Sequence, residues 1–363
     1  MDSDEMRRFI ENFSFDKCKK GNQGFNRVLI QLFGLLGHGK SSFINTCIYV
    51  WKDCEFENWS KSMDNDGGHT TERIPYELTE NITLVDNRGC GKMDDKESGV
   101  IFAQLGNLLP LGKEVQWGEG FGLVERMVKA EKEVKTSDFI FPVFVYSVKK
   151  EITNPEKEDL KLLFQTAQKL TGVIPIVVLT HKTAGSLTKT EGIFRDLGID
   201  RIFSFENYTR EDHMKTRGKH EEVLKFFCEV VRDVQFRVDQ PRDPSEEMKM
   251  RRKLVLNYIH ECDIKEQQRK VENMKALEQV QEVQKLKQQE EEMKKRREEE
   301  ERQQEEGYKR HQQQYQWERE CDRARQEEEI KALREDPKKK SAEKKTKKTS
   351  YFENMFKTKK KDS

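Results

Sequence analysis

The chain has 363 residues, room for one to three domains, with 34% hydrophobic residues, 37% charged residues and a net charge of +1. These averages combine two unlike parts, because an apolar, turn-rich sequence gives way after about residue 238 to one dominated by Glu, Lys, Arg and Gln. Seven scattered cysteines without a C-x-x-C pair disfavour a zinc site or a disulfide framework and predict a reducing compartment. The N-terminus has no apolar signal segment, and the longest apolar run, 139–148, is too short to cross a bilayer. We therefore expect a cytoplasmic protein, held at a membrane only if another feature attaches it.

Four segments follow along the chain: a short N-terminal amphipathic helix in 1–24, an α/β domain over 25–240, a charged helical or coiled-coil extension over 245–335, and a disordered lysine-rich tail over 336–363. In the α/β domain, apolar runs alternate with amphipathic ones, which predicts a mainly parallel sheet covered by helices. Strands are expected at 26–33, 73–79, 81–86, 139–147, 173–179 and 201–205. Helices are expected at 40–51, 95–109, 119–134, 155–171, 188–197 and 219–238.

Residues 34–41, Gly-Leu-Leu-Gly-His-Gly-Lys-Ser, complete the pattern G-x-x-x-x-G-K-[ST] between the first expected strand and the first following helix. Backbone N–H groups of such a glycine-rich turn point at phosphate oxygens, and the helix start adds its positive dipole end. Lys40 is expected to reach the β- and γ-phosphates, and the Ser41 hydroxyl to ligate Mg²⁺. Contacts to the nucleotide are expected from Gly34, Leu35, Gly37, His38, Gly39, Lys40, Ser41 and Ser42.

A D-x-x-G motif, residues 86–89, follows the expected strand 81–86. In P-loop GTPases such an aspartate holds Mg²⁺ through water and the glycine N–H meets the γ-phosphate, so we expect these roles for Asp86 and Gly89. The polar segment 51–73 predicts a mobile loop at the nucleotide. In it, Thr70, with Thr71 close behind, is expected to contact Mg²⁺ and the γ-phosphate; a loop threonine without a ligand is the alternative.

The base is expected to contact the ends of the last two strands. Thr180-His181-Lys182-Thr183 stands where GTPases place N/T-K-x-D, in which a lysine stem packs on the base and an aspartate accepts two guanine N–H groups. His181 takes the stacking position. Thr183 takes the aspartate position, so guanine selectivity is weakened or supplied elsewhere. The expected base contacts are Thr180, His181, Lys182 and Asn207.

These residues carry a resemblance. G-L-L-G-H-G-K-S-S-F-I-N, the D-x-x-G motif, L-T-H-K and F-x-x-x-N-Y together resemble the interferon-induced protein 44 family and, more distantly, septin-like and immunity-related GTPases. Thr70-x-Glu72-Arg73-x-Pro75-Tyr76 also resembles switch I of the immunity-related GTPases. The similarity covers about residues 25–240. It implies a P-loop GTPase fold, GTP and GDP with Mg²⁺ as ligands, a role in interferon or immune responses, and self-association through the nucleotide face.

Hydrolysis needs a positioned water and a charge that stabilises the transition state. Cys90 follows D-x-x-G where many small GTPases have glutamine, and Leu36 stands where some larger GTPases place a polar catalytic residue. Arg88 and Arg73 are candidate arginine fingers, although each is more often a solvated switch residue. We therefore expect a slow GTPase switch in which Lys40, Thr70 and Gly89 serve the chemistry. The alternative is a nucleotide-binding scaffold that does not cycle.

Beyond Pro244, apolar positions between 254 and 286 form an imperfect stripe, compatible with packing on the α/β domain or with a coiled coil. From 287 to 329 the stripe vanishes. Glu290–Lys294, Glu291–Lys295 and Glu292–Arg296 are i,i+4 pairs, each contributing about 0.2–0.5 kcal/mol. This favours a solvated single helix over a dimeric coiled coil, interrupted at Gly307.

Residues 338–363 hold 11 lysines against three acids, about +8, with aromatic residues interspersed. A disordered tail or localisation signal is the first interpretation, adhesion of 338–361 to an anionic membrane the second, and nucleic-acid binding the third. The expected partners are thus a guanine nucleotide, a second copy bound through the nucleotide face or the helix, and an anionic membrane. No specific nucleic acid is predicted.

Overall fold

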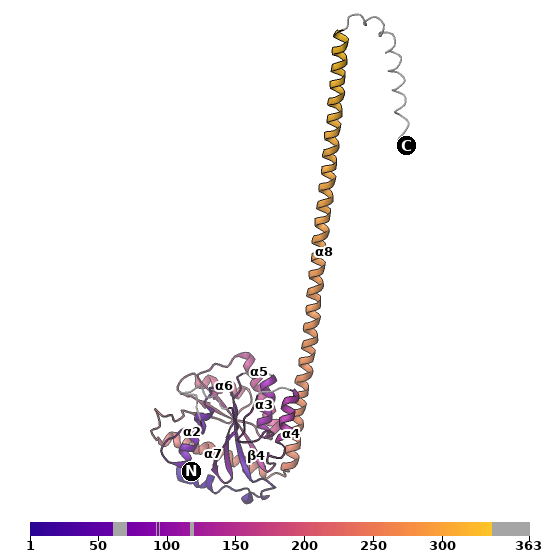
Figure 1. The fold of residues 1–363 in the computed structure, drawn as a ribbon. Coiled ribbons are helices and arrows are strands. Elements are labelled where there is room, and N and C mark those ends of the chain that lie inside the picture. The colour runs from indigo at the N-terminus through magenta and orange to yellow at the C-terminus, as the bar shows by residue number, and fades with distance from the viewer. Residues whose placement is uncertain (61–70, 92, 94, 117–119, 336–363) are drawn as a thin grey trace. The chain divides into compact units, whose positions relative to one another are not determined.

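A six-stranded sheet between two layers of helices forms the core of the chain (Figure 1). The chain divides into a compact unit, Met1–Lys270, and a second unit that begins at Val271. The predicted α/β class with a mostly parallel sheet and a long C-terminal helix is confirmed. The computed structural model describes residues 1–60, 71–91, 93, 95–116 and 120–335.

The strands follow the order β2-β3-β1-β4-β5-β6, and within it only β2 and β3 pair antiparallel. All six predicted strands are present, because runs of Val, Ile, Leu and Phe suit strands that are buried on both faces. The strands are β1 (Arg27–Phe33), β2 (Ile74–Thr79), β3 (Ile82–Asp86), β4 (Asp138–Ser147), β5 (Ile176–Thr180) and β6 (Ile202–Phe205).

The predicted helices are also present, although α3 and α4 each end four residues earlier than expected. Asn107 adopts a φ of 53°, the left-handed conformation that typically ends a helix, so α3 stops before the expected residue 109. The helices are α1 (Ser3–Glu11), the 3₁₀ turn η1 (Phe15–Lys17), α2 (Lys40–Lys52), α3 (Asp95–Leu105), α4 (Gly120–Ala130), α5 (Asn154–Thr171), α6 (Leu187–Asp196), α7 (Arg217–Val238) and α8 (Pro244–Glu335).

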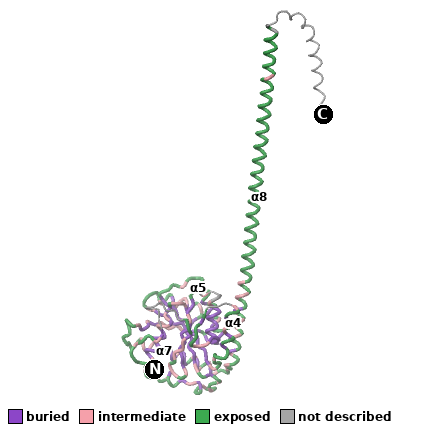
Figure 2. Tube along the Cα trace, in the orientation of Figure 1, coloured by how far each residue is buried: buried purple, intermediate pink, exposed green. Residues whose placement is uncertain are grey.

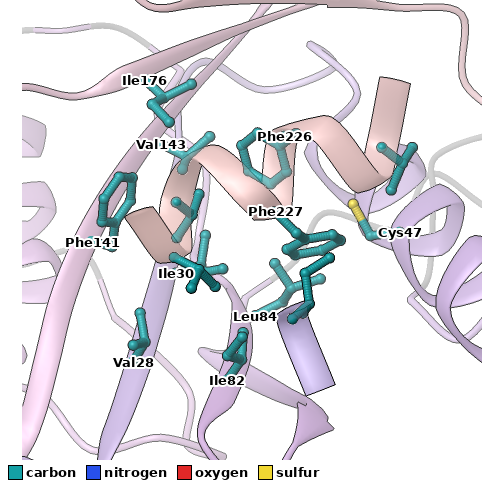
Figure 3. Close-up of a cluster of buried hydrophobic side chains, with 14 of the residues drawn as sticks. Val28, Ile30, Cys47, Ile82, Leu84, Phe141, Val143, Ile176, Phe226 and Phe227 are labelled. Atoms are coloured by element: carbon teal, nitrogen blue, oxygen red, sulfur yellow. The ribbon is translucent and has the colours of Figure 1, made fainter. Parts of the chain in front are cut away.

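Alternate side chains of the strands pack against different helix layers. On one face, strand residues including Val28, Ile30 and Leu84 meet Phe226 and Phe227 of α7, with α1 and α2 completing the layer (Figure 3). On the other face, α3, α4, α5 and α6 cover the sheet together with the first turns of α8. Because both faces of the sheet are covered, its polar groups can meet a ligand only at the strand ends.

The first turns of α8 belong to this second layer. Met248, Val255 and Ile259 are buried, and the ring of Tyr258 lies edge-on to that of Phe102 in α3, with centroids 4.8 Å apart. The compact unit therefore includes part of the long helix, which is one of the two arrangements that the apolar stripe allowed.

Within the second unit, α8 is solvated. From Val271 to Arg334 the described side chains are exposed, except for the half-buried Cys321 (Figure 2). The predicted Glu291–Lys295 pair is present at 3.5 Å. No described helix is both long enough and apolar enough to cross a membrane.

The predicted interruption at Gly307 is wrong, because α8 continues through it. Glycine costs a helix interior about 1 kcal/mol relative to alanine. Two ion pairs span the position, Glu305–Lys309 at 2.9 Å and Glu306–Arg310 at 3.5 Å, and each offsets about 0.2–0.5 kcal/mol of that cost.

A buried polar network lies between the sheet and α3. Its centre is Arg73, which is fully buried just before β2. The Arg73 guanidinium donates to Asn87 Oδ1 at 2.9 Å, Gln31 Oε1 at 3.1 Å, Asn107 Oδ1 at 3.3 Å and the Leu109 carbonyl. One side chain thus joins the chain before β2, the D-x-x-G segment, β1 and the end of α3.

Replacing Arg73 with Met should destabilise the fold. Burial lowers the pKa of Arg73 to about 9, although the Asp138 carboxylate acts in the opposite direction. Removing the guanidinium leaves several buried acceptors unpaired, each at about 1–3 kcal/mol, so we expect Arg73→Met to lower the free energy of unfolding by about 3 kcal/mol or more. Denaturant unfolding measures this difference. The exposed Arg195→Met is the control, and its free energy of unfolding should lie within about 0.5 kcal/mol of the wild-type value. Equal stabilities would contradict the network.

Candidate nucleotide-binding site

The glycine-rich segment 34–39 joins the end of β1 to the start of α2. Gly34 has a φ of 142° and lies so close to the Val145 carbonyl of β4 that a Cβ would not fit. Gly39 caps α2 in the left-handed conformation, and a Cβ there would meet the Thr180 side chain at 3.2 Å. The N–H groups at the start of α2 thus face the carboxyl edge of the sheet, an arrangement suited to an anion.

Lys40 begins α2 and is 6% exposed. Its ammonium donates to the carbonyls of Gly34 at 3.1 Å and Leu35 at 2.9 Å. Burial lowers the pKa of Lys40, and the carboxylate of Asp86 acts against that shift. A cation that donates to neutral carbonyls is placed to gain from an arriving anion, because low-dielectric surroundings strengthen that attraction.

The D-x-x-G segment closes over this lysine. A Cβ on Gly89 would lie 2.5 Å from Lys40 Nζ, so any larger residue there would displace the ammonium. Leu36 N–H donates to the Cys90 carbonyl at 2.8 Å, and Cys90 N–H to the Gly34 carbonyl at 3.4 Å. The predicted juxtaposition of the two motifs is therefore present.

Three oxygen-bearing side chains meet beside α2. The hydroxyls of Ser41 and Ser60 each lie 2.8 Å from Asp86 Oδ2. Asn45 of α2 holds Ser60 in place, accepting from its N–H at 2.7 Å and donating to its carbonyl at 2.9 Å. Hydroxyl and carboxylate oxygens are ligands that Mg²⁺ prefers, so this donor set fits the metal that the sequence implies. Ser60 was missed because the polar segment around it has no periodicity.

The structure does not place the expected switch threonine, because Thr70 lies outside the described residues together with 61–69 of the expected loop. Thr71 is exposed, and its carbonyl accepts from Val115 N–H at 2.8 Å. Arg73 is neither an arginine finger nor a solvated switch residue, because its guanidinium is fully buried. The Arg88 guanidinium donates to the Val115 carbonyl.

His38 links the glycine-rich segment 34–39 to β4 and β5. Its Nδ1 accepts from Ser147 N–H at 3.3 Å, its carbonyl accepts from the Thr180 hydroxyl at 2.9 Å, and its ring lies edge-on to Tyr146. Burial, followed by the charges of Lys40 and Lys150, lowers the pKa of His38 to about 3. The imidazole is therefore neutral at physiological pH and serves as an acceptor that fixes the loop.

The segment after β5 turns sharply. His181 has a φ of 55°, and its Nδ1 lies 3.0 Å from the Ser147 hydroxyl and 3.1 Å from that of Thr180. The Lys182 ammonium forms an ion pair with both Glu222 oxygens at 3.0 Å, so its charge is engaged by α7. Of the four expected base contacts, Thr180 is thus tied to the phosphate loop and Lys182 to α7.

The loop after β6 meets the loop after β5. Glu206 Oε2 accepts from the Thr183 hydroxyl at 2.8 Å and from its N–H at 3.2 Å. Asn207 is 9% exposed, and Tyr208 N–H donates to Thr46 Oγ1 of α2 at 3.0 Å. Glu206 was missed in the sequence, although the absence of an acid at position 183 signalled that a carboxylate should be sought at a neighbouring strand end.

Comparisons with known proteins add no assignment. No family model and no curated protein matches the chain. Among solved structures, one similar chain is the protein ttk003000868 from Thermus thermophilus, with 14% sequence identity and a TM-score of 0.28 over 48% of this chain. This chain spans 22% of that protein, and so partial a likeness carries no argument about fold or function.

Replacing His38 with Gln should change how stability depends on pH. The ordinary histidine pKa is 6.5 and that of His38 is about 3, so the unfolded chain binds more protons between these values. The contribution of His38 to the free energy of unfolding is therefore complete above pH 6.5 and is lost as the pH falls toward 3. Over that range we expect a shallower decline in the His38→Gln variant, measured by denaturant unfolding at a series of pH values.

The matched control is His311→Gln, at an exposed position of α8. It should reproduce the wild-type pH dependence. A wild-type slope in the His38 variant as well would contradict the buried neutral imidazole.

Proposed function

We propose that the compact unit is a P-loop GTPase domain that binds GTP or GDP with Mg²⁺ and acts as a slow nucleotide-controlled switch. The observation that carries the proposal is the environment of Lys40. Its buried ammonium lies at the start of α2, between the glycine-rich segment and Gly89, and next to the Ser41–Asp86 pair. Each of these groups comes from a motif whose role in phosphate or Mg²⁺ binding follows from its chemistry.

The sheet supports this assignment. In an open α/β sheet, ligands bind beyond the carboxyl ends of the strands. The loop 34–39, the D-x-x-G segment and the segments after β5 and β6 all follow the carboxyl ends of parallel strands. When bound, Mg²⁺ would neutralise charge on the β- and γ-phosphates, and Ser41, Asp86 and Ser60 are the described residues that would hold it.

Slow hydrolysis follows from what surrounds Gly89. Cys90, next in the chain, is 1% exposed and its backbone is bonded to the phosphate loop. The Leu36 side chain is apolar and would lie 3.1 Å from a Cβ on Gly89. Neither side chain orients water, and the buried Arg73 supplies no charge to the transition state. We therefore propose that this protein binds nucleotide far more effectively than it hydrolyses it.

A second candidate function is a scaffold whose nucleotide does not cycle. The long solvated part of α8 favours it, because an exposed, charged helix presents a surface without needing hydrolysis. The proposed role in interferon or immune responses and the proposed contact of 338–361 with anionic membranes are compatible with either candidate. The two differ in whether assembly depends on the nucleotide.

Replacing Lys40 with Met tests nucleotide binding. The isosteric apolar chain removes the ammonium, so we expect the Kd for GTP to rise at least about 30-fold, equivalent to about 2 kcal/mol. Burying an unpaired charge is costly, so the free energy of unfolding should stay equal or increase. Calorimetric titration of the full chain with GTP, GDP and ATP measures the change in affinity. Denaturant unfolding measures the change in the free energy of unfolding.

Lys161→Met, at an exposed position of α5, is the control and should bind as wild type does. Unchanged affinity in Lys40→Met would overturn the proposed site. Sedimentation of both variants with and without GTP then separates the candidates, since the switch loses nucleotide-dependent assembly with Lys40 and the scaffold does not.

Replacing Ser60 with Ala tests the metal ligands. Loss of one neutral ligand is expected to cost about 1 kcal/mol, which raises the Mg²⁺ concentration needed for half-maximal GTP binding about fivefold. Titration of GTP at a series of Mg²⁺ concentrations measures this midpoint. The exposed Ser245→Ala should leave it unchanged. An unchanged midpoint in Ser60→Ala would remove Ser60 from the metal site.

A further inference from the structure

The part of the proposed site that would bind the nucleotide base lacks the carboxylate that guanine recognition requires at position 183. Guanine presents two adjacent donors, the N1–H and the 2-amino group, whereas adenine presents an acceptor at N1. A carboxylate accepts both guanine donors. Thr183 occupies the position at which that carboxylate is expected, and its hydroxyl cannot replace it.

The neighbouring strand brings a carboxylate to Thr183. Glu206 directly follows β6, and its Oε2 accepts from both the hydroxyl and the N–H of Thr183, at 2.8 and 3.2 Å. Two donors from one residue fix the position of that oxygen. Among the described residues, no hydrogen bond to Oε1 is present, so half of the carboxylate remains able to accept.

A second acceptor lies next in the chain. Asn207 is 9% exposed, and its buried Oδ1 accepts no hydrogen bond from the part of the chain that the structure describes. Buried polar atoms are normally paired, so an unpaired one calls for an explanation. A ligand edge rich in donors would supply the missing partner. Glu206 and Asn207 together give an acceptor-rich site, which suits guanine and opposes the N1 of adenine.

The position of these residues matches the reach of a nucleotide. β5 and β6 lie two and three strands from β1, about 10–15 Å at the usual strand spacing. Two hydrogen bonds join the ends of β5 and β6 to the proposed phosphate site. The Thr180 hydroxyl donates to the His38 carbonyl, and Tyr208 N–H donates to Thr46 of α2. An extended nucleotide with its phosphates at Lys40 thus brings its base to the loops after β5 and β6.

We propose that Glu206, positioned by Thr183, is the residue that selects guanine, and that Asn207 assists it as a second acceptor. The carboxylate that binds the base thus comes from the segment after β6 rather than from the segment after β5. This inference rests on the proposed nucleotide-binding function and goes beyond it by naming the residue that separates GTP from ATP.

Glu206→Gln tests the proposal by reversing a preference. Xanthine has a carbonyl oxygen where guanine has its amino group, so a carboxylate repels it and a glutamine amide donates to it. In calorimetric titrations of the full chain with Mg²⁺, wild type should prefer GTP to ATP and to xanthosine triphosphate. In Glu206→Gln, GTP affinity should fall at least about tenfold while xanthosine triphosphate affinity rises, so that the preference between these two reverses.

Two further variants keep the test specific. Glu191→Gln removes a half-buried carboxylate that bonds Ser204 of β6 at 3.0 Å, and should leave the nucleotide preference unchanged. Thr183→Val removes the hydroxyl that holds Glu206 and should reduce GTP preference in the same direction as Glu206→Gln, but less. Inosine triphosphate, which lacks the 2-amino group, should bind wild type more weakly than GTP does.

The outcomes separate two failures. If no purine nucleoside triphosphate binds wild type, the proposed function fails and this inference with it. If nucleotides bind in a Lys40-dependent way but Glu206→Gln keeps the wild-type ratio of GTP to xanthosine triphosphate, only the inference is overturned. An ATP affinity in wild type equal to that for GTP overturns it as well.

Discussion

The ammonium of Lys40 is buried at the carboxyl edge of the sheet, and the backbone segments around it are arranged to hold it there. Removing a charge from water costs several kcal/mol, and the two carbonyls that contact Lys40 offset only part of that cost. The backbone of Gly89 approaches the ammonium so closely that a Cβ there would lie 2.5 Å from Nζ, and the tight contact of Gly34 with β4 fixes the carbonyls that accept from it. The fold thus keeps a destabilised cation in a narrow backbone cage. An anion bound at the proposed site would restore that stability, because a ligand that binds only the folded state stabilises it.

The sequence predicts well what depends on neighbours along the chain. Strands such as β4, Asp138–Ser147, were predictable because an uninterrupted apolar run suits a strand buried on both faces. The glycine-rich turn between β1 and α2 was predictable because its glycines and Lys40 stand at fixed spacing between an apolar strand and a helix. Helix ends were less predictable. The left-handed Asn107 that ends α3 has no distinctive local signal, and the two ion pairs that span Gly307 in α8 offset much of the local cost of glycine.

The remaining site residues depend on contacts between distant segments. Ser60 reaches Asp86 across 26 positions and Thr183 reaches Glu206 across 23, and no local pattern records which polar side chains will meet. The burial of Arg73 was also unpredictable from its neighbours along the chain. A charged residue beside a polar loop indicates exposure, yet Gln31, Asn87 and Asn107, from three other segments, supply acceptors that allow its burial.

The position of α3 gives the proposed switch a short route to the long helix. α3 follows the D-x-x-G segment, whose Arg88 N–H donates to Gln104 of α3 at 3.0 Å. On its flank, Phe102 packs against Tyr258 of α8. Directly packed groups thus connect the D-x-x-G segment with the first turns of α8. Self-association along the apolar positions of α8 is harder to support, because Val271, Met274, Leu277, Val280, Val283 and Leu286 recur every third residue. Each step moves about 60° around the helix, so these side chains spiral and form no continuous seam. Nucleotide-dependent contacts are better sought on the compact unit, where α3 and α8 meet.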